Sequence, residues 1–134
     1  MTRKSSNRLL WTAQVLAAAL FLFAGSMKFI VPAEQMQQGP VALPLTFMYF
    51  IGICECFGAL GLLLPGLFRI QTWLTPLAAG GLTIIMIGAT TVSIPMGIGA
   101  GFPAIVGIIT AWIAYARTRV APIHEAPRAV LRAA

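Results

Sequence analysis

Residues 45–64 read LTFMYFIGICECFGALGLLL, an apolar run that carries a single charged residue, Glu55, near its middle. An apolar run of about 20 residues is long enough to cross a lipid bilayer as a helix. A carboxylate at the centre of a bilayer costs several kcal/mol unless it is paired, protonated or turned into a cavity. The run therefore predicts a transmembrane helix, and Glu55 is the first candidate functional residue.

Small residues flank this carboxylate on the predicted helix. At about 100° per residue, Gly52, Glu55 and Gly58 share one stripe. The stripe also contains Met48, Ile51, Ala59 and Leu62. Because small residues let helix backbones approach closely in a bilayer, we expect the stripe to face other helices and to carry Glu55 into the protein interior.

The composition places the whole chain in the membrane. Of 134 residues, 59% are hydrophobic and only 9% are charged, which is too apolar for a soluble domain of this length. We predict an all-α, integral membrane four-helix bundle with short loops and spans at about 9–30, 45–64, 73–94 and 102–117. Residues 1–8 form a basic N-terminal segment ahead of this domain (9–117), and 118–134 form a basic tail that we expect to be flexible.

Charge predicts the topology. Basic residues occur before the first span, at Arg69 between the second and third spans, and in the tail, whereas the other two loops have none beyond Lys28 at a helix end. Such residues favour the cytoplasmic side, so both termini are predicted to be cytoplasmic. This distribution also accounts for the net charge of +6, and we expect no nucleic-acid partner.

The first span carries its own small and polar stripe, which includes Gln14, Gly25 and Lys28. We expect it to face the stripe of Glu55. Lys28 either turns inward or extends to the membrane surface. At 1.5 Å of rise per residue, Lys28 lies more than about 10 Å farther from the cytoplasmic boundary than Glu55, a gap that strains even two extended side chains. Helix tilt or a bridging group can close such a gap, so the sequence leaves direct pairing open.

Metal and thiol chemistry have little support in the sequence. Cys54 and Cys56 point to nearly opposite sides of one helix, so they cannot form a disulfide with each other. Such thiols usually serve as small hydrophobic side chains. The single histidine, His124, lies in the tail, which leaves too few ligands for a metal, haem or iron–sulfur site. We assign no catalytic residue.

Two motifs carry a family resemblance. The first span closes with Gly25-Ser-Met-Lys28, and the second contains Gly52, Glu55 and Gly58 followed by Leu-Leu-Leu-Pro65. The pair resembles the signatures of the DoxX family of small four-helix bacterial membrane proteins. The resemblance covers roughly residues 10–117 and includes the Ile-Gly-Ala segment at 87–89.

The resemblance implies a multi-pass protein of the bacterial inner membrane, with Lys28 and Glu55 at the matched signature positions. Some relatives resemble membrane subunits of quinone-linked oxidoreductases that act on thiosulfate or thiols, and some animal relatives act as membrane chaperones. Many relatives carry a histidine near the end of the third span, where Thr90, Thr91 and Ser93 stand here. Its absence argues against a proton-coupled redox role.

The leading interpretation is a non-catalytic membrane subunit, not an enzyme on its own, that docks a redox partner or binds a quinone-like lipid without a covalent link. Its partners would be membrane lipids, a soluble or membrane redox protein, or further copies of itself. The alternative is a membrane assembly or chaperone-type protein. A small proton-coupled transporter is less favoured, because the charge bias fixes one orientation whereas such transporters work as inverted dimers. The candidate ligand or partner site comprises Glu55, Lys28, Gly25, Gly52, Gly58 and Gln14.

Overall fold

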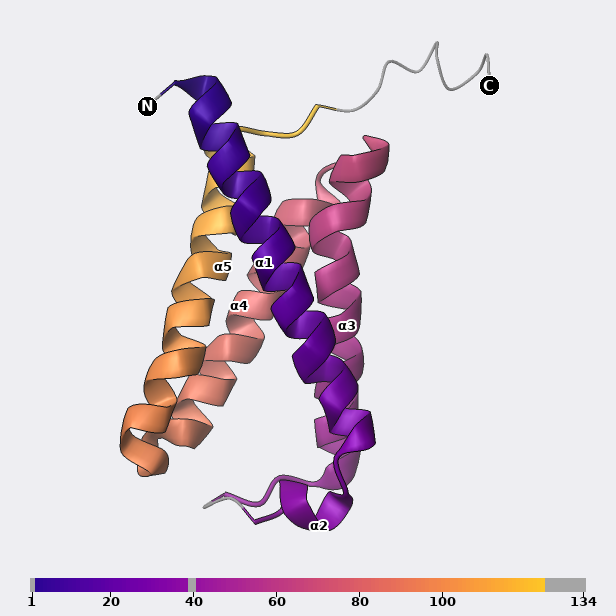
Figure 1. Ribbon diagram of the computed structural model, residues 1–134, viewed down its shortest axis with the longest axis vertical. Helices are drawn as coiled ribbons and strands as arrows, with labels where there is room; N and C mark the ends of the chain where they lie inside the picture. Colours follow the sequence, from indigo (N-terminus) through magenta and orange to yellow (C-terminus); the bar gives the residue numbers. More distant parts are fainter. Residues whose placement is uncertain (1, 39–40, 125–134) are drawn as a thin grey trace.

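Four long helices form a single bundle in a computed structural model that describes residues 2–38 and 41–124 (Figure 1). The long helices are α1 (Arg3–Ile30), α3 (Leu45–Phe68), α4 (Leu74–Ser93) and α5 (Gly101–Arg119). A short helix, α2 (Ala33–Met36), lies in the first loop, and a 3-10 turn, η1 (Ile94–Ala100), joins α4 to α5. The described residues contain no strand, and the predicted all-α bundle is confirmed.

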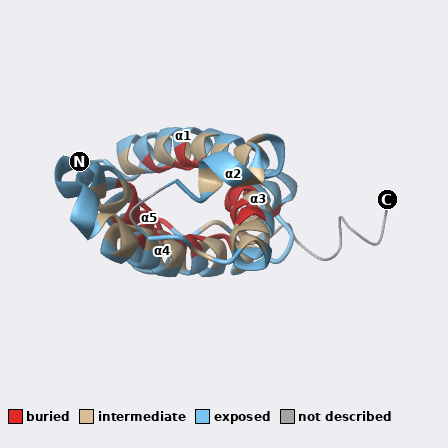
Figure 2. Cartoon of the chain, turned by 90° about the horizontal axis from the view of Figure 1, so that it is seen from below, coloured by how far each residue is buried: buried red, intermediate tan, exposed pale blue. Residues whose placement is uncertain are grey.

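The bundle consists of two helix pairs. Helix α1 packs along α3, and α4 packs along α5, while contacts between α3 and α4 join the two pairs. The α1–α5 junction is much looser than these. Figure 1 shows the two pairs diverging towards the end that carries α2. Seen along the bundle, the buried residues face inward and most outer surfaces are exposed (Figure 2).

The outer surfaces are strongly apolar. Phe57 and Ile84 are exposed by 70% and 72%, respectively, and many other large hydrophobic side chains point outward with them. Helix α1, helix α3 and the helical run Leu74–Arg119 are long and apolar enough to cross a membrane. Within that run Gly97 has φ 64° and ψ −113°, a conformation that only glycine adopts easily, and it separates α4 from α5. The chain is therefore a membrane protein with an outer surface suited to lipid.

The largest extensions of the helices beyond the predicted spans are at the start of α1 and the end of α3. Helix α1 begins at Arg3 because the Thr2 side chain accepts a hydrogen bond from the backbone N–H of Ser5 at 3.3 Å, as an N-cap does. Helix α3 continues through Pro65 to Phe68, since proline removes only one backbone donor and neighbouring helices support the turn. Of the predicted flexible tail, the structure describes only the part up to His124, and 125–134 lie outside the described residues.

Candidate functional site

Lys28 and Glu55 form an ion pair between α1 and α3. The Lys28 Nζ atom donates to Glu55 Oε2 at 2.6 Å. The Glu55 side chain is only 4% exposed, whereas that of Lys28 is 19% exposed. The predicted inward orientation of Glu55 is confirmed, and the question of whether the two residues pair is answered.

Glycines set the register that makes this pair. A Cβ atom on Gly25 would lie 2.8 Å from the backbone oxygen of Gly52, so the two helices touch here through their backbones. Lys28 lies three residues beyond Gly25 and Glu55 three residues beyond Gly52, in opposite directions along the bundle. At 1.5 Å per residue, their Cα atoms are therefore about 9 Å apart along the axes.

Side-chain direction closes that separation. The Cα–Cβ bond in a helix tilts towards the N-terminus of its own helix. Because α1 and α3 are antiparallel, Lys28 leans towards Glu55 and Glu55 leans towards Lys28. A separation counted from the membrane boundary by helical rise alone does not include this tilt, so it overestimates the distance between the two charged groups.

The third glycine of the predicted site brings α4 close to α3. A Cβ atom on Gly58 would lie 2.6 Å from Leu82 Cδ2 of α4. Cys56 lies beside Gly25, whereas Cys54 lines a groove between α3 and α4. Both cysteines are free thiols and neither joins the ion pair.

Gln14, the remaining predicted site residue, belongs to a second polar cluster towards the end of the bundle where α1 begins and α5 ends. Its Nε2 donates to the backbone oxygen of Leu62 at 2.6 Å, and its Oε1 accepts from Arg117 Nε at 2.5 Å. Nη1 of Arg117 donates to Asn7 Oδ1 at 2.7 Å and to the backbone oxygen of Ala121 at 3.0 Å. The structure therefore does not bring Gln14 together with Lys28 and Glu55.

The sequence did not lead us to predict that Arg117 is buried, because the positive charges from the end of the fourth span onward were attributed to the membrane topology. It is only 3% exposed, and its guanidinium lies 5.4 Å from the centre of the Trp11 ring, a cation–π contact that α1 offers to α5. A signal was present in the sequence. Val106, Thr110, Ile113 and Arg117 recur at intervals of four, three and four residues, which places Arg117 on the buried face of α5.

The structure also tests the glycines of α4. By helical periodicity Ala78, Gly81 and Gly88 share one face of this helix, which predicts a packing face, but a Cβ atom on Gly81 or Gly88 would meet nothing within 4 Å. The buried residues of α4 are Thr75, Ala79, Leu82 and Met86, on another face of the helix. The two glycines therefore do not form a packing face within the described bundle, because the larger side chains of that other face fill the interior.

The Gly25–Gly52 contact and the Lys28–Glu55 pair lie within a stretch of the chain that matches a family model. That model, described as the DoxX-like family, covers residues 12–116. The chain belongs to the DoxX-like family. No curated protein and no solved structure matches it.

In this DoxX-like protein the interior polar groups are largely engaged with one another. Lys28 donates to Glu55, and Arg117 donates to Gln14. Thr83 Oγ1 of α4 donates to Thr110 Oγ1 of α5 at 2.9 Å. Within the described residues no three of His, Cys, Asp and Glu gather where they would hold a metal ion. These contacts tie the helices to one another in the membrane.

Proposed function

We propose that this DoxX-like protein is a non-catalytic subunit of the bacterial inner membrane, with both termini in the cytoplasm, that binds a quinone-like lipid and presents it to a redox partner. The observation that supports this most directly is an apolar groove of about 320 Å³ along the loose α1–α5 junction. Its walls include Leu9, Thr12, Ala13, Leu16, Ile109 and Trp112.

The groove has the character of a site for a flat, apolar ring. Small-molecule sites are mostly apolar with a few polar groups, and their volumes begin at about 300 Å³. Trp112 offers an aromatic face for stacking and an indole N–H that can donate to a quinone carbonyl. An isoprenoid tail would continue along the apolar outer surface of the bundle.

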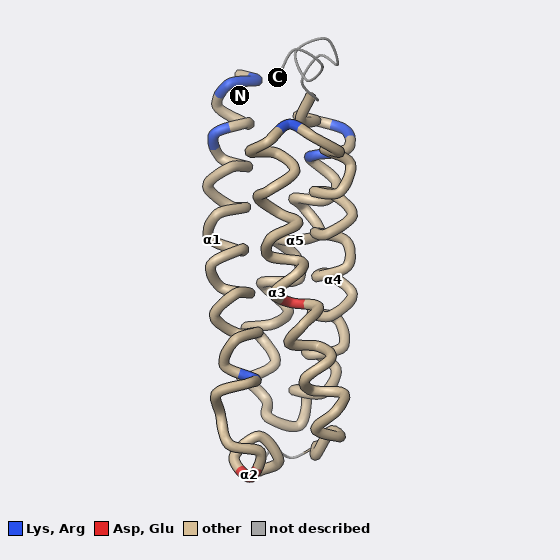
Figure 3. Tube along the Cα trace, turned by 90° about the vertical axis from the view of Figure 1, so that its right-hand side faces the viewer, with Lys and Arg blue, Asp and Glu red and all other residues tan. Residues whose placement is uncertain are grey.

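Charge distribution supports the orientation in this proposal. Arginine and lysine residues gather at the end where α1 begins and α5 ends, while α2, which contains Glu34, lies at the opposite end (Figure 3). Lysine and arginine favour the cytoplasmic side of short loops. A soluble redox partner would then meet the bundle at its basic end.

The test is photoaffinity labelling in lipid nanodiscs with an azidoquinone that carries one isoprene unit. We expect labelled peptides from the α1–α5 groove, and we expect excess unlabelled short-chain quinone to abolish the labelling. Ala13→Leu fills the groove and should reduce labelling about tenfold, whereas Ala19→Leu adds the same atoms to an exposed face of α1 outside the groove and should not. Labelling that competitor does not remove, or equal labelling of the two variants, would refute the quinone site.

One observation favours the assembly-protein alternative. A second groove, of about 580 Å³, lies between α3 and α4 and is lined partly by Gly61, Ala78 and Gly81. Gly61 and Ala78 lie against each other in this groove, whereas no described residue covers Gly81. A small uncovered residue is suited to the close approach of a partner helix. If the protein shields partner helices there, Gly81→Leu should abolish co-purification of a membrane partner, while quinone labelling in the α1–α5 groove stays unchanged.

A further inference from the structure

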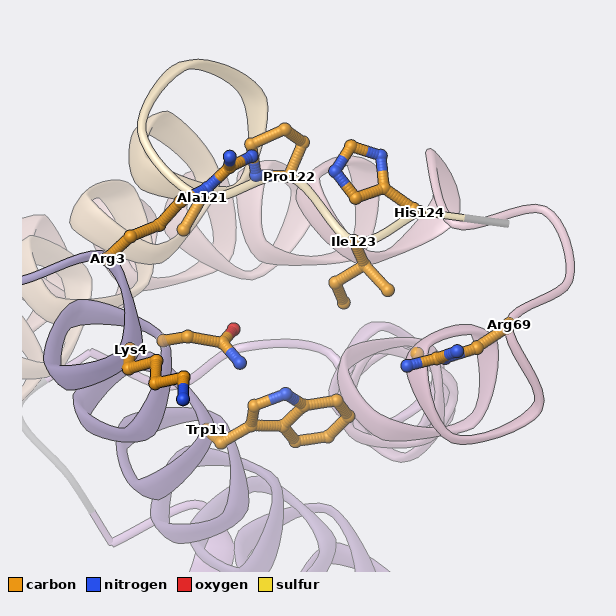
Figure 4. Close-up of a pocket in the computed structure, with 10 residues that line it drawn as sticks. Arg3, Lys4, Trp11, Arg69, Ala121, Pro122, Ile123 and His124 are labelled. Atoms are coloured by element: carbon orange, nitrogen blue, oxygen red, sulfur yellow. The ribbon is translucent and has the colours of Figure 1, made fainter. Parts of the chain in front are cut away.

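A separate cavity of about 500 Å³ opens at the basic end of the bundle. Three segments that are distant in the sequence converge on it: the first turns of α1, the end of α3 and the residues that follow α5. Figure 4 shows Arg3 and Lys4 from the first, Arg69 from the second and His124 from the third, with Trp11 and Ile123 between them. The cavity shares no lining residue with the α1–α5 groove.

The lining of this cavity is positively charged and contains no carboxylate. Glu55 is engaged with Lys28, and Glu34 lies on α2 at the opposite end of the bundle, so neither acid of the described residues offsets Arg3, Lys4 or Arg69. Cations brought together in this way repel one another. A bound anion would remove that repulsion.

A further cation stands directly behind the cavity wall. Asn7, Trp11 and Ala121 line the cavity, and the Arg117 guanidinium contacts all three from the protein side. Arg117 is 97% buried, and its Nη2 makes no hydrogen bond to any described residue. Its charge adds to the positive potential of the cavity, because a buried charge is screened little by salt.

The backbone at Arg69 is a third observation. Arg69 ends α3 with φ 54° and ψ 36°, in the left-handed region, and the N–H groups of Arg69 and Ile70 close the helix on the backbone oxygen of Pro65. Glycine is the usual residue at such a helix end, and a side chain there is strained by about 1 kcal/mol or more. Figure 4 shows the Arg69 side chain extending across the cavity towards Trp11. Arg69 therefore occupies a position where the left-handed backbone conformation favours glycine.

We propose that this cavity binds a phosphate group, carried either by an anionic phospholipid headgroup or by a free phosphate compound. Guanidinium and ammonium groups donate charge-assisted hydrogen bonds to phosphate oxygens, and arginine does so in a two-pronged geometry. The apolar side of the cavity, with Trp11 and Ile123, suits the glycerol and acyl portion of a lipid at the depth where tryptophans meet headgroups.

The experiment measures binding of dihexanoyl phosphatidylglycerol to the full-length protein in a non-ionic detergent, with dihexanoylglycerol, a neutral lipid of the same chain length that lacks the phosphate, as the control. We expect the phosphatidylglycerol to bind at least about tenfold more tightly, which is the worth of one or two charge-assisted hydrogen bonds. Competition by inorganic phosphate or pyrophosphate would identify a free phosphate compound as the ligand, and competition only by phosphatidylglycerol would identify the lipid headgroup.

Arg69→Gly is the informative variant, because glycine suits the left-handed backbone and the fold should be retained with an unchanged or raised Tm. We expect it to weaken binding about tenfold. Arg8→Gln removes a positive charge from an exposed residue of α1 that does not line the cavity, and it should change binding less than about twofold. Lys4→Gln gives a second cavity variant, with an expected loss of at least about threefold. Equal effects of Arg69→Gly and Arg8→Gln, or equal binding of the two lipids, would overturn the proposal.

Discussion

Replacing Lys28 in the Lys28–Glu55 pair should lower the free energy of unfolding much more than replacing Glu55. Lys28→Met leaves the Glu55 carboxylate, 4% exposed, without its cation in the bundle interior. Removing one partner of a buried ion pair typically costs about 3–5 kcal/mol. Glu55→Gln leaves the Lys28 ammonium, but its side chain is 19% exposed and has a flexible stem that can turn towards the membrane surface. We therefore expect a smaller loss of about 1–2 kcal/mol.

The assay is reversible denaturation in mixed detergent micelles, monitored by circular dichroism, with the free energy of unfolding of four variants compared with that of the parent protein. The third variant, Lys28→Met with Glu55→Gln, removes both charges together and should recover most of the loss, because it leaves no unpaired ion. The fourth, Lys4→Met, makes the same chemical change at an exposed lysine and should alter stability by less than about 0.5 kcal/mol. If Lys28→Met is as stable as Lys4→Met, or if the double variant is less stable than both single variants, the ion pair does not stabilise the bundle as argued here.

Three further predictions concern packing, the second polar cluster and topology. Gly25→Ala should destabilise the bundle by about 1–3 kcal/mol, because its Cβ would lie 2.8 Å from a backbone oxygen of the facing helix. Gly88→Ala, whose Cβ would meet nothing within 4 Å, should be neutral or stabilising by up to about 1 kcal/mol. The same denaturation assay compares the two variants, and equal losses of stability would contradict the close contact at Gly25. Gln14→Leu should lower the free energy of unfolding by about 1–3 kcal/mol because it leaves the buried Arg117 Nε without its partner, and a variant as stable as the parent would refute that role. In a protein whose native cysteines are both replaced by alanine, a cysteine introduced at Gln37 should react with an impermeant maleimide only from the outer side of the membrane; labelling only from the cytoplasm would reverse the topology.

Local patterns along the chain predict much of this architecture. The apolar run around Glu55 and the three runs like it specify helices that cross a membrane, because length and hydropathy are properties of each segment by itself. The spacing of Gly52, Glu55 and Gly58 placed the carboxylate on an inward face, since the 3.6-residue helical period acts within one helix. The same reasoning assigned Gln14, Gly25 and Lys28 to one stripe, and the structure places all three at inward positions.

What depended on the tertiary structure was the position of one helix against another. The Lys28–Glu55 contact depends on the register that the Gly25–Gly52 backbone contact sets, and no property of a single segment specifies that register. Burial of Arg117 required Gln14, Asn7 and Trp11 from a helix more than 100 residues away along the chain. The cavity at the basic end likewise exists only because the start of α1, the end of α3 and the segment after α5 meet in space. Contacts of this kind are set by packing between helices, so periodicity along one helix carries no information about them.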